Sequence, residues 1–306
     1  MRIAIAIGDP NGIGPEIAVK ASVRPPAGVE AVLVGDAFVI EHYRRKHANG
    51  TRPGVAAVEV LPRDAFVPGT MDPRAGAATV AYVREAVRMA QAGEVDAVIA
   101  CPQSETAITR AGIPFSGYTG LVADLTGTPR ERAFLMLVAA GLRIAHVTLH
   151  ESVRDALARM TPELVAAAGA AAVEAVRRLG IAAPRLGVFG INPHAGEDGL
   201  FGDEDERITR PAVAHLREQG IAADGPTGAD LLLGQRRHDV YLAMFHDQGH
   251  IPVKLLSPLR SSALTIGTPV LFSSVGHGCA YDIAGKGMAE PASVSETLTL
   301  LGNARR

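Results

Sequence analysis

Histidine is the residue type in this chain that most clearly offers chemistry. His150, His194 and His246 lie at or just after expected strands, and sites in α/β proteins are built where strands end. Imidazole binds zinc and similar divalent metals, and three protein ligands with one open position make a catalytic site. Long stretches of chain separate the three, without the spacing of a local metal motif. The residues alone therefore leave open isolated surface or hydrogen-bonded histidines.

Charged residues near these histidines could move protons. Asp247 adjoins His246, and Lys254 follows it in the same segment. Both are candidate proton-transfer groups, although a lysine acts as a base only if burial or a metal ion lowers its pKa. Asp230 could instead orient a histidine from behind, and His250 is a weaker candidate. A surface or salt-bridged role is the alternative for each of them.

A glycine-rich segment near the C-terminus, His277–Pro291, could hold a nucleotide. Its glycines let the backbone pass close to a flat ligand, and Asp282 can accept hydrogen bonds from two ribose hydroxyls. A carboxylate there repels an additional 2′-phosphate, so the segment favours NAD over NADP. A turn ahead of the last helix is the competing interpretation on composition alone.

The opening segment Gly8–Glu16 also contains several glycines. It does not match the G-x-G-x-x-G nucleotide pattern, because Ile17 stands where the third glycine should be. A tight turn from the first strand into a helix explains its glycines at least as well.

Composition narrows the function classes. The chain has 306 residues, 47% hydrophobic and 20% charged, which fits a globular enzyme with a sizeable core. A net charge of −2 and 4% aromatic residues argue against nucleic-acid binding. Cys101 and Cys279 are too few for a disulfide framework, and no signal peptide or membrane-spanning run is expected. We therefore expect a cytoplasmic enzyme without a membrane partner.

Short apolar runs alternate with stretches of helical period, which predicts a mostly parallel sheet covered on both faces. Thr161 followed by Pro162 is a strong helix start. The expected helices are Ala77–Ala92, Thr161–Leu179 and Asp203–Gln219. The expected strands are Ile3–Ile7, Ala31–Val34, Ala97–Ala100, Phe134–Val138, Ile144–Thr148, Leu186–Ile191, Val240–Phe245 and Val270–Ser274.

The segment His277–Pro291 resembles the adenosine-binding loop of the β-decarboxylating dehydrogenases, the isopropylmalate and isocitrate dehydrogenases. This resemblance implies a two-domain α/β/α fold of the isopropylmalate-dehydrogenase type, with the active site in the interdomain cleft. It implies a first domain of residues 1–125 plus 270–306, carrying the cofactor loop, and a second of residues 126–269, carrying the metal ligands and the dimer interface. The NAD contacts that it implies are His277, Gly278, Ala280, Asp282 and Ile283.

Further segments spread over nearly the whole chain resemble the 4-hydroxythreonine-4-phosphate dehydrogenase family, an offshoot of the same superfamily. That family binds a divalent metal through three histidines shared between the two subunits of a homodimer. The resemblance places these ligands at His150, His194 and His246. His150 is preferred to His146 because it stands as many positions before Thr161, which opens the next helix, as the family's histidine stands before the corresponding Thr. Zinc is the expected metal, with Mg, Mn or Co as alternatives. The segments are Gly8–Glu16, Ala111–Gly117, Gly190–Glu197, Gly225–Asp230 and Ala243–Gly249.

Several positions depart from the phosphate-handling pattern of that family. Only Thr119 and Lys254 of its substrate contacts are present. A lysine and an arginine of the pattern are replaced by an acid and an aromatic residue, so the pocket loses two cations and gains an anion. The substrate is therefore not expected to be the phosphate ester. The departing positions are Ser104, Glu105, Tyr118, Ala263 and Phe272.

The segments Ala100–Ile108, Leu142–Arg154 and Gly249–Leu256 resemble the terephthalate cis-dihydrodiol dehydrogenases, although Ser104 departs from that subgroup too. The resemblance implies NAD- and metal-dependent oxidation and decarboxylation of a carboxylated cis-dihydrodiol to protocatechuate, CO2 and NADH. Tyr118, Thr119 and Lys254 are the expected substrate contacts, with Tyr118 and Phe272 flanking a flat ring.

Three alternatives to this function stay open. The first is 4-hydroxythreonine-4-phosphate dehydrogenase of vitamin B6 biosynthesis, or a related phospho-hydroxyacid dehydrogenase. The second is a metallohydrolase, which would use three histidines and an activated water but would have no use for the Asp282 segment. The third is a ligand-binding protein without catalysis, against which the three histidines argue.

Overall fold

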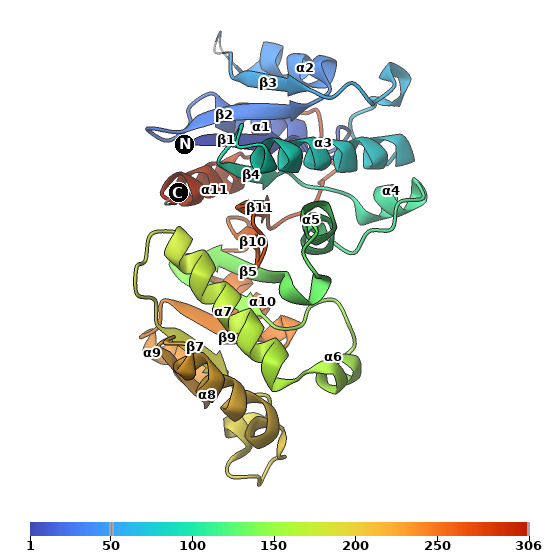
Figure 1. Ribbon diagram of the computed structural model, residues 1–306. Helices are drawn as coiled ribbons and strands as arrows, with labels where there is room; N and C mark the ends of the chain where they lie inside the picture. The colour runs from blue at the N-terminus through green and yellow to red at the C-terminus, as the bar shows by residue number, and fades with distance from the viewer. Residues whose placement is uncertain (49, 51, 305–306) are drawn as a thin grey trace. The chain divides into compact units, whose positions relative to one another are not determined.

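A computed structural model describes residues 1–48, 50 and 52–304 of the chain (Figure 1). They form two compact units. Unit 1 contains Met1–Gly127, Leu259–Ala263 and Pro269–Asn303. Unit 2 contains Thr128–Pro258, Leu264–Thr268 and Ala304. The last residue of the domain range expected from the sequence, position 306, lies outside the described residues.

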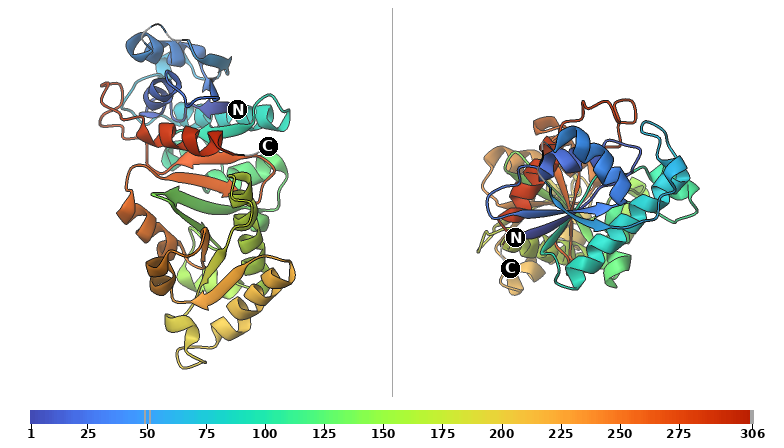
Figure 2. Two further views of the ribbon diagram at one scale, coloured as in Figure 1. Left: turned by 90° about the vertical axis from the view of Figure 1, so that its left-hand side faces the viewer. Right: turned by 90° about the horizontal axis from the view of Figure 1, so that it is seen from above.

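The sheet of unit 1 consists of parallel strands in the order β3-β2-β1-β4-β11. The strands β1 and β4 are almost fully buried because helices cover both faces (Figure 2). For this reason the sequences of these two strands are nearly continuous runs of apolar residues. Their bounds are β1 Arg2–Ala6, β2 Glu30–Gly35, β3 Gly54–Ala57, β4 Ala97–Ala100 and β11 Phe272–Val275.

The longest helix of unit 1, α3 (Pro73–Gln91), begins where the Asp72 side chain accepts a hydrogen bond from the Arg74 amide. Pro73 at its first position suits the helix start because its missing N–H would have no partner there. The other helical elements are α1 Gly14–Ser22, α2 Ala37–His47, η1 Arg63–Ala65, α4 Glu105–Arg110, α5 Tyr118–Thr126 and α11 Ala292–Gly302.

Unit 2 contains strands in the order β5-β6-β9-β7-β8, of which only the β5–β6 pair is antiparallel. The parallel neighbours β6 and β9 end at the same edge. The segments that carry His150 and His246 follow these two strands. The bounds are β5 Phe134–Ala139, β6 Leu142–His146, β7 Leu186–Phe189, β8 Ala223–Thr227 and β9 Val240–Ala243, and β10 (Ser262–Ile266) has residues of both units.

Helix α7 of unit 2 (Pro162–Arg178) confirms the expected helix start. The Thr161 hydroxyl accepts a hydrogen bond from the Leu164 amide at 3.2 Å, and Pro162 is the first helical residue. The remaining helical elements are η2 Arg130–Arg132, α6 Val153–Arg159, η3 Pro193–Gly196, η4 Asp205–Thr209, α8 Arg210–Glu218, α9 Ala229–Gln235 and α10 His246–Leu256.

The expected α/β class with mostly parallel strands is confirmed, whereas some elements were missed. β3 is an exposed strand that opens with a glycine, β8 contains Gly225 and Pro226, and β10 is rich in hydroxyl residues, so none has a strong strand pattern. The expected strand over Ile144–Thr148 ends already at His146. Among the described residues no single helix is long and apolar enough to cross a membrane, although α6 and α7, bent by 96°, reach that length and composition together.

Candidate functional site

His246 and His150 approach each other in unit 2, with their ring centroids 5.2 Å apart. His246 is the first residue of α10 and His150 lies in the loop after β6. Gln248 fixes the start of α10, because its side-chain oxygen accepts the Met244 and Phe245 amides at 2.9 and 3.1 Å. His246 therefore lies at a helix start that is held by hydrogen bonds, and both histidines lie at one edge of the sheet.

Two of the three candidate ligands hold a carboxylate against Nδ1. Asp247 lies 2.7 Å from His246 Nδ1, and Glu197 lies 3.0 Å from His194 Nδ1. A carboxylate at one ring nitrogen of a histidine fixes the tautomer and leaves Nε2 unprotonated, which is the usual arrangement behind a metal-bound imidazole. The side chains present therefore fit a divalent metal. Asp247, expected as a proton-transfer group, contacts its neighbouring ring, and its role in proton transfer stays a prediction.

His194 is held in an unfavourable backbone conformation. Its φ of 53° lies in the left-handed region that residues with a Cβ rarely adopt, and Glu197 shares that region. The buried Asp205 carboxylate stabilises this turn by accepting the amides of Ile191 and Asn192, both at 2.8 Å. Backbone strain of this kind persists only where the surrounding structure enforces it, and it is more frequent at functional sites than elsewhere.

The three candidate histidine ligands are not grouped together in the described part of one chain. The His194 side chain is 74% exposed, and the ring beside it is Phe201, at 6.0 Å between centroids. Within the described part of one chain, no group of three or more His, Cys, Asp or Glu side chains is arranged to hold a metal ion. The three histidines therefore do not meet as a ligand set in a single chain.

Two further histidines lie close to His246: His146, the alternative first ligand, and His250, a weaker candidate. Burial lowers the pKa of His146 to about 3 and that of His250 to about 4, and the neighbouring histidines add to both shifts. Both rings are therefore neutral at pH 7. His250 also stacks on His246, with ring centroids 3.6 Å apart.

Hydrogen bonds assign the tautomers of this pair. His146 Nδ1 must donate to the Leu135 carbonyl at 3.3 Å, so its Nε2 accepts from His250 Nδ1 at 3.1 Å. His250 Nε2 is then the unprotonated nitrogen. Because both nitrogens of the buried His146 are engaged, the structure favours the exposed His150 over His146 as a ligand.

Lys254 and Asp230 have different surroundings. Lys254 lies in α10, and partial burial lowers the pKa of its ammonium group, which is what a proton-transfer role requires. Asp230 is an exposed residue in the first turn of α9, and among the described contacts no hydrogen bond joins it to a histidine. The carboxylates that contact candidate metal ligands are Asp247 and Glu197, which stand one and three residues after their histidines.

The segment His277–Ala289 in unit 1, here called the Asp282 loop, carries the residues expected to bind the cofactor. His277 is fixed to the start of α11 by a 2.7 Å contact between its Nε2 and the Ser293 hydroxyl. Ala280 has a φ of 42°, and the Ile283 amide donates to its carbonyl, so Asp282 lies within a tight turn. The Asp282 side chain is exposed, as a ribose-binding carboxylate must be. Gly278 has open space at its Cβ position.

The substrate-binding expectation for Tyr118 and Phe272 needs correction. The Tyr118 hydroxyl donates to the Cys101 carbonyl at 2.9 Å, and its ring packs against Phe272 with centroids 5.6 Å apart. Phe272 is fully buried, so it cannot flank a bound ring. Tyr118 is itself 9% exposed. Thr119, in the first turn of α5, is half-buried and keeps its expected role as a prediction.

Comparison with known proteins gives a consistent family. The model of the family described as pyridoxal phosphate biosynthetic protein PdxA matches residues 21–301. A 1,2-dihydroxy-3,5-cyclohexadiene-1,4-dicarboxylate dehydrogenase of a Comamonas species is 51% identical over 98% of this chain and 97% of its own length. The named relatives are dehydrogenases, which supports a dehydrogenase role for this chain.

Solved structures agree with this assignment. A terephthalate 1,2-cis-dihydrodiol dehydrogenase from Burkholderia xenovorans LB400 is 52% identical, with a TM-score of 0.77 over 99% of this chain and 98% of that one. A 4-hydroxythreonine-4-phosphate dehydrogenase from Burkholderia phymatum is 36% identical, with a TM-score of 0.85 over 100% and 99%. A β-decarboxylating dehydrogenase from Thermococcus kodakarensis, 17% identical with a TM-score of 0.53 over 98% and 83%, shares the fold alone.

Proposed function

Since the chain belongs to the pyridoxal phosphate biosynthetic protein PdxA family, we propose that it is an NAD- and divalent-metal-dependent dehydrogenase that oxidises and decarboxylates a carboxylated cis-dihydrodiol. Terephthalate cis-dihydrodiol is the proposed substrate, and protocatechuate, CO2 and NADH are the products. The observation that carries the proposal is the 51% identity, over nearly the whole chain, to a dehydrogenase named for such a dihydrodiol dicarboxylate. A cytoplasmic location remains a prediction.

The charge of the former phosphate positions supports this substrate. Glu105 is exposed, whereas Ala263 and Phe272 are buried and apolar. A phosphate ester is bound by cations and several hydrogen-bond donors, and none of these side chains supplies either. A dicarboxylate that is bound in part through a metal needs fewer cations and hydrogen-bond donors at these positions.

The proposed metal ligands are His150 and His246 of one chain together with His194 of a second copy of the chain. Zinc is the first choice because imidazole is a preferred zinc ligand, and Mg, Mn or Co are alternatives. When bound, the ion supplies Lewis acidity that lowers the pKa of the substrate hydroxyl. Asp247 and Glu197 orient two of the imidazoles through Nδ1.

NAD supplies the hydride acceptor, held in this proposal by the Asp282 loop. Lys254, with its lowered pKa, is the proposed group that takes the proton of the hydroxyl being oxidised. It later returns a proton to the same oxygen, which becomes a catechol hydroxyl when loss of CO2 makes the ring aromatic. Asp247 serves mainly to orient His246. Asp230 remains a proposed orienting residue that would act in the assembled site, and Thr119 a proposed substrate contact.

Exposed apolar side chains support the homodimer. On α10, Ile251 and Leu255 are 54% and 80% exposed, and beside His194 the residues Leu200 and Phe201 are 72% and 47% exposed. Apolar side chains gathered close to candidate ligands fit a surface that a second subunit covers. The partner would thus complete the metal site and bury these side chains together.

Mixing two inactive variants tests this shared site. In a heterodimer of His150→Ala and His194→Ala subunits, both changes fall in one site and the other site is intact. Random exchange makes half of the dimers mixed, so about one quarter of wild-type NADH formation should return. The matched control is His150→Ala with His246→Ala, which leaves no intact site. Absence of recovery after exchange verified by mass spectrometry would mean that each site lies within one chain.

Asp282 allows a separate test of the cofactor. We expect NAD to be preferred over NADP by at least ~10-fold in kcat/KM, because a carboxylate beside a 2′-phosphate costs on the order of 1 kcal/mol or more. Asp282→Lys should move the preference toward NADP, and Asp282→Asn should reduce it without reversing it. Equal kcat/KM for both dinucleotides in the wild type would refute the role of Asp282.

A second function is supported by a specific observation. The chain aligns with a 4-hydroxythreonine-4-phosphate dehydrogenase at a TM-score of 0.85, and it retains Thr119 and Lys254 of that family's substrate contacts. Oxidation of a phosphorylated hydroxy acid would use the same histidines and the same Asp282 loop. The two functions differ in the substrate that is oxidised.

A further inference from the structure

The opening segment Gly8–Glu16 has no role in the proposed chemistry, yet it is entirely buried. Its amides are already used: Gly12 donates to the Asp9 carbonyl at 3.0 Å, and Ile13 donates to the Cys279 carbonyl at 2.9 Å. A phosphate-binding turn needs free amides aimed at the ligand. The segment therefore does not bind phosphate, and its second partner, Cys279, belongs to the Asp282 loop.

Asp9 joins this segment to the first half of the Asp282 loop. Asp9 is fully buried, and its carboxylate accepts the Asn11 amide at 2.9 Å and the Tyr281 hydroxyl at 2.7 Å. Burial raises the pKa of Asp9, and the hydrogen bond from Tyr281 opposes that shift. Tyr281 directly precedes Asp282, so this bond fixes the backbone next to the candidate ribose-binding carboxylate.

Glu16 and Lys20 of α1 hold the second half of the loop. The Lys20 ammonium donates to the carbonyls of Gly287 and Ala289 at 3.0 and 2.8 Å. The buried Glu16 carboxylate accepts from Lys20 at 2.7 Å and from the Ala289 amide at 3.0 Å. The stretch between Tyr281 and Gly287 thus projects from two anchored ends, with Asp282 exposed on it.

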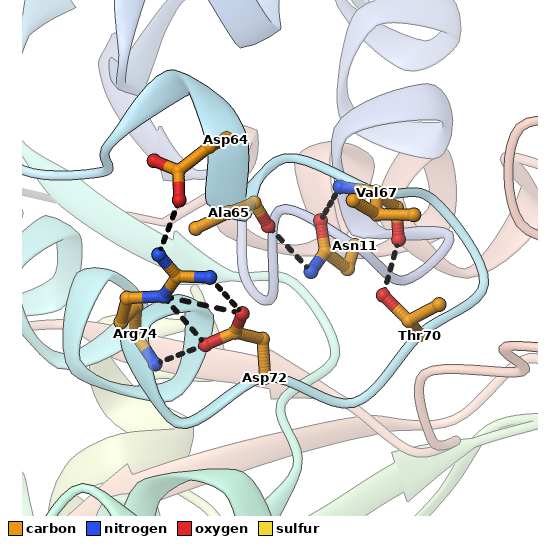
Figure 3. Close-up of polar contacts among 7 residues, drawn as sticks. All are labelled: Asn11, Asp64, Ala65, Val67, Thr70, Asp72 and Arg74. Atoms are coloured by element: carbon orange, nitrogen blue, oxygen red, sulfur yellow. Dashed lines mark hydrogen bonds and ion pairs between the residues drawn. The ribbon is translucent and has the colours of Figure 1, made fainter.

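A third contact comes from the segment that precedes α3. Asn11 accepts the Val67 amide at 2.9 Å and donates to the Ala65 carbonyl at 3.0 Å, as Figure 3 shows. Pro68 then lies against the loop, because a Cβ on Gly285 would fall 2.9 Å from its Cβ. Gly285 also has a φ of 76°, so a side chain at this position is excluded on two grounds.

We propose that the segment Gly8–Lys20, buried except at Lys20, is the platform of the Asp282 loop, and that Tyr281 and Lys20 are positioning residues for the dinucleotide. They act through the backbone on either side of Asp282 and do not themselves touch the ligand. The inference rests on the proposed NAD-binding function. Loss of either anchor lets the loop sample conformations in which Asp282 no longer contacts the ribose. Binding of NAD must then also order the loop, and the free-energy cost of that ordering lowers the NAD affinity.

Tyr281→Phe tests the first anchor, because it removes one oxygen and leaves a buried carboxylate oxygen without its donor. We expect the Kd and KM for NAD to rise about 10-fold, while kcat and the metal affinity stay within about 2-fold. Amide hydrogen exchange in the Asp282 loop should become faster, with β5 and β6 unchanged. Tyr241→Phe is the matched control, since the buried Tyr241 hydroxyl has no hydrogen-bond partner among the described residues.

Lys20→Met tests the second anchor and serves if Tyr281→Phe does not fold, because it keeps the aliphatic stem of the side chain. The same rise in KM for NAD is expected. Unchanged NAD affinity in folded Tyr281→Phe and Lys20→Met proteins would overturn the inference. If the wild type binds no NAD at all, the proposed function fails instead, and unchanged hydrogen exchange in the variants would separately reject the platform.

Discussion

Removal of divalent ions is expected to abolish NADH formation, and readdition of zinc or another divalent ion should restore it. The proposed site has three protein ligands, so His194→Ala or His246→Ala should weaken metal binding by at least ~100-fold and bring activity to background. Both side chains are at least partly exposed, at 74% and 32%, so the fold should survive. Metal content by mass spectrometry, activity and thermal melting together check this result.

Graded variants separate a metal role from general damage. Asp247→Asn keeps the size of the side chain but weakens its hold on His246 Nδ1, and a loss of 10–100-fold in metal affinity is expected. His215→Ala is the control, because His215 is an exposed histidine of α8 outside the cluster. Full turnover by chelated protein shown to be metal-free would reject the metal site altogether.

The second large effect concerns the substrate. A carboxylated cis-dihydrodiol such as that of terephthalate should be oxidised with one CO2 released for each NADH formed. 4-Hydroxythreonine 4-phosphate should be turned over at least ~100-fold less efficiently, equivalent to about 2.7 kcal/mol in transition-state binding. The physical reason is the missing cationic surface at Glu105 and its neighbours.

Both substrates should be compared under identical metal and salt conditions, by NADH absorbance and by trapping of CO2. Glu105→Lys gives an internal check, because returning a cation should raise kcat/KM for the phosphate ester without helping the dihydrodiol. Efficient turnover of the phosphate ester, with none of the dihydrodiol, would support the alternative function, oxidation of a phosphorylated hydroxy acid. Oxidation of the dihydrodiol without CO2 release would remove the decarboxylation step only.

Much of the architecture follows from local sequence properties. Buried parallel strands need apolar side chains on both faces, which is why β1 and β4 can be found as short apolar runs. The start of α7 depends on Thr161 and Pro162 alone, because capping is a contact between near neighbours. The weakly patterned strands β3, β8 and β10 depend on pairing partners far away in the chain, so no local signal reveals them.

The candidate site shows the same division. Residue types and motif resemblance indicated the histidines and the Asp282 loop from sequence. Only the tertiary structure distinguishes the two histidines. His146 is buried and has a hydrogen bond at each ring nitrogen, whereas His150 is exposed, because burial is decided by the elements that pack over a position.

Tertiary contacts also decided the roles of several neighbours. The Tyr118 ring packs on Phe272 and is not exposed for contact with a ligand. The glycines near Asp9 form a buried turn, and the Asp9 carboxylate accepts a hydrogen bond from Tyr281, near the other end of the chain. A sequence pattern carries the preferences of each residue and its near neighbours. Contacts between distant segments arise only when the whole chain has folded, and these contacts determine which polar groups remain free for chemistry.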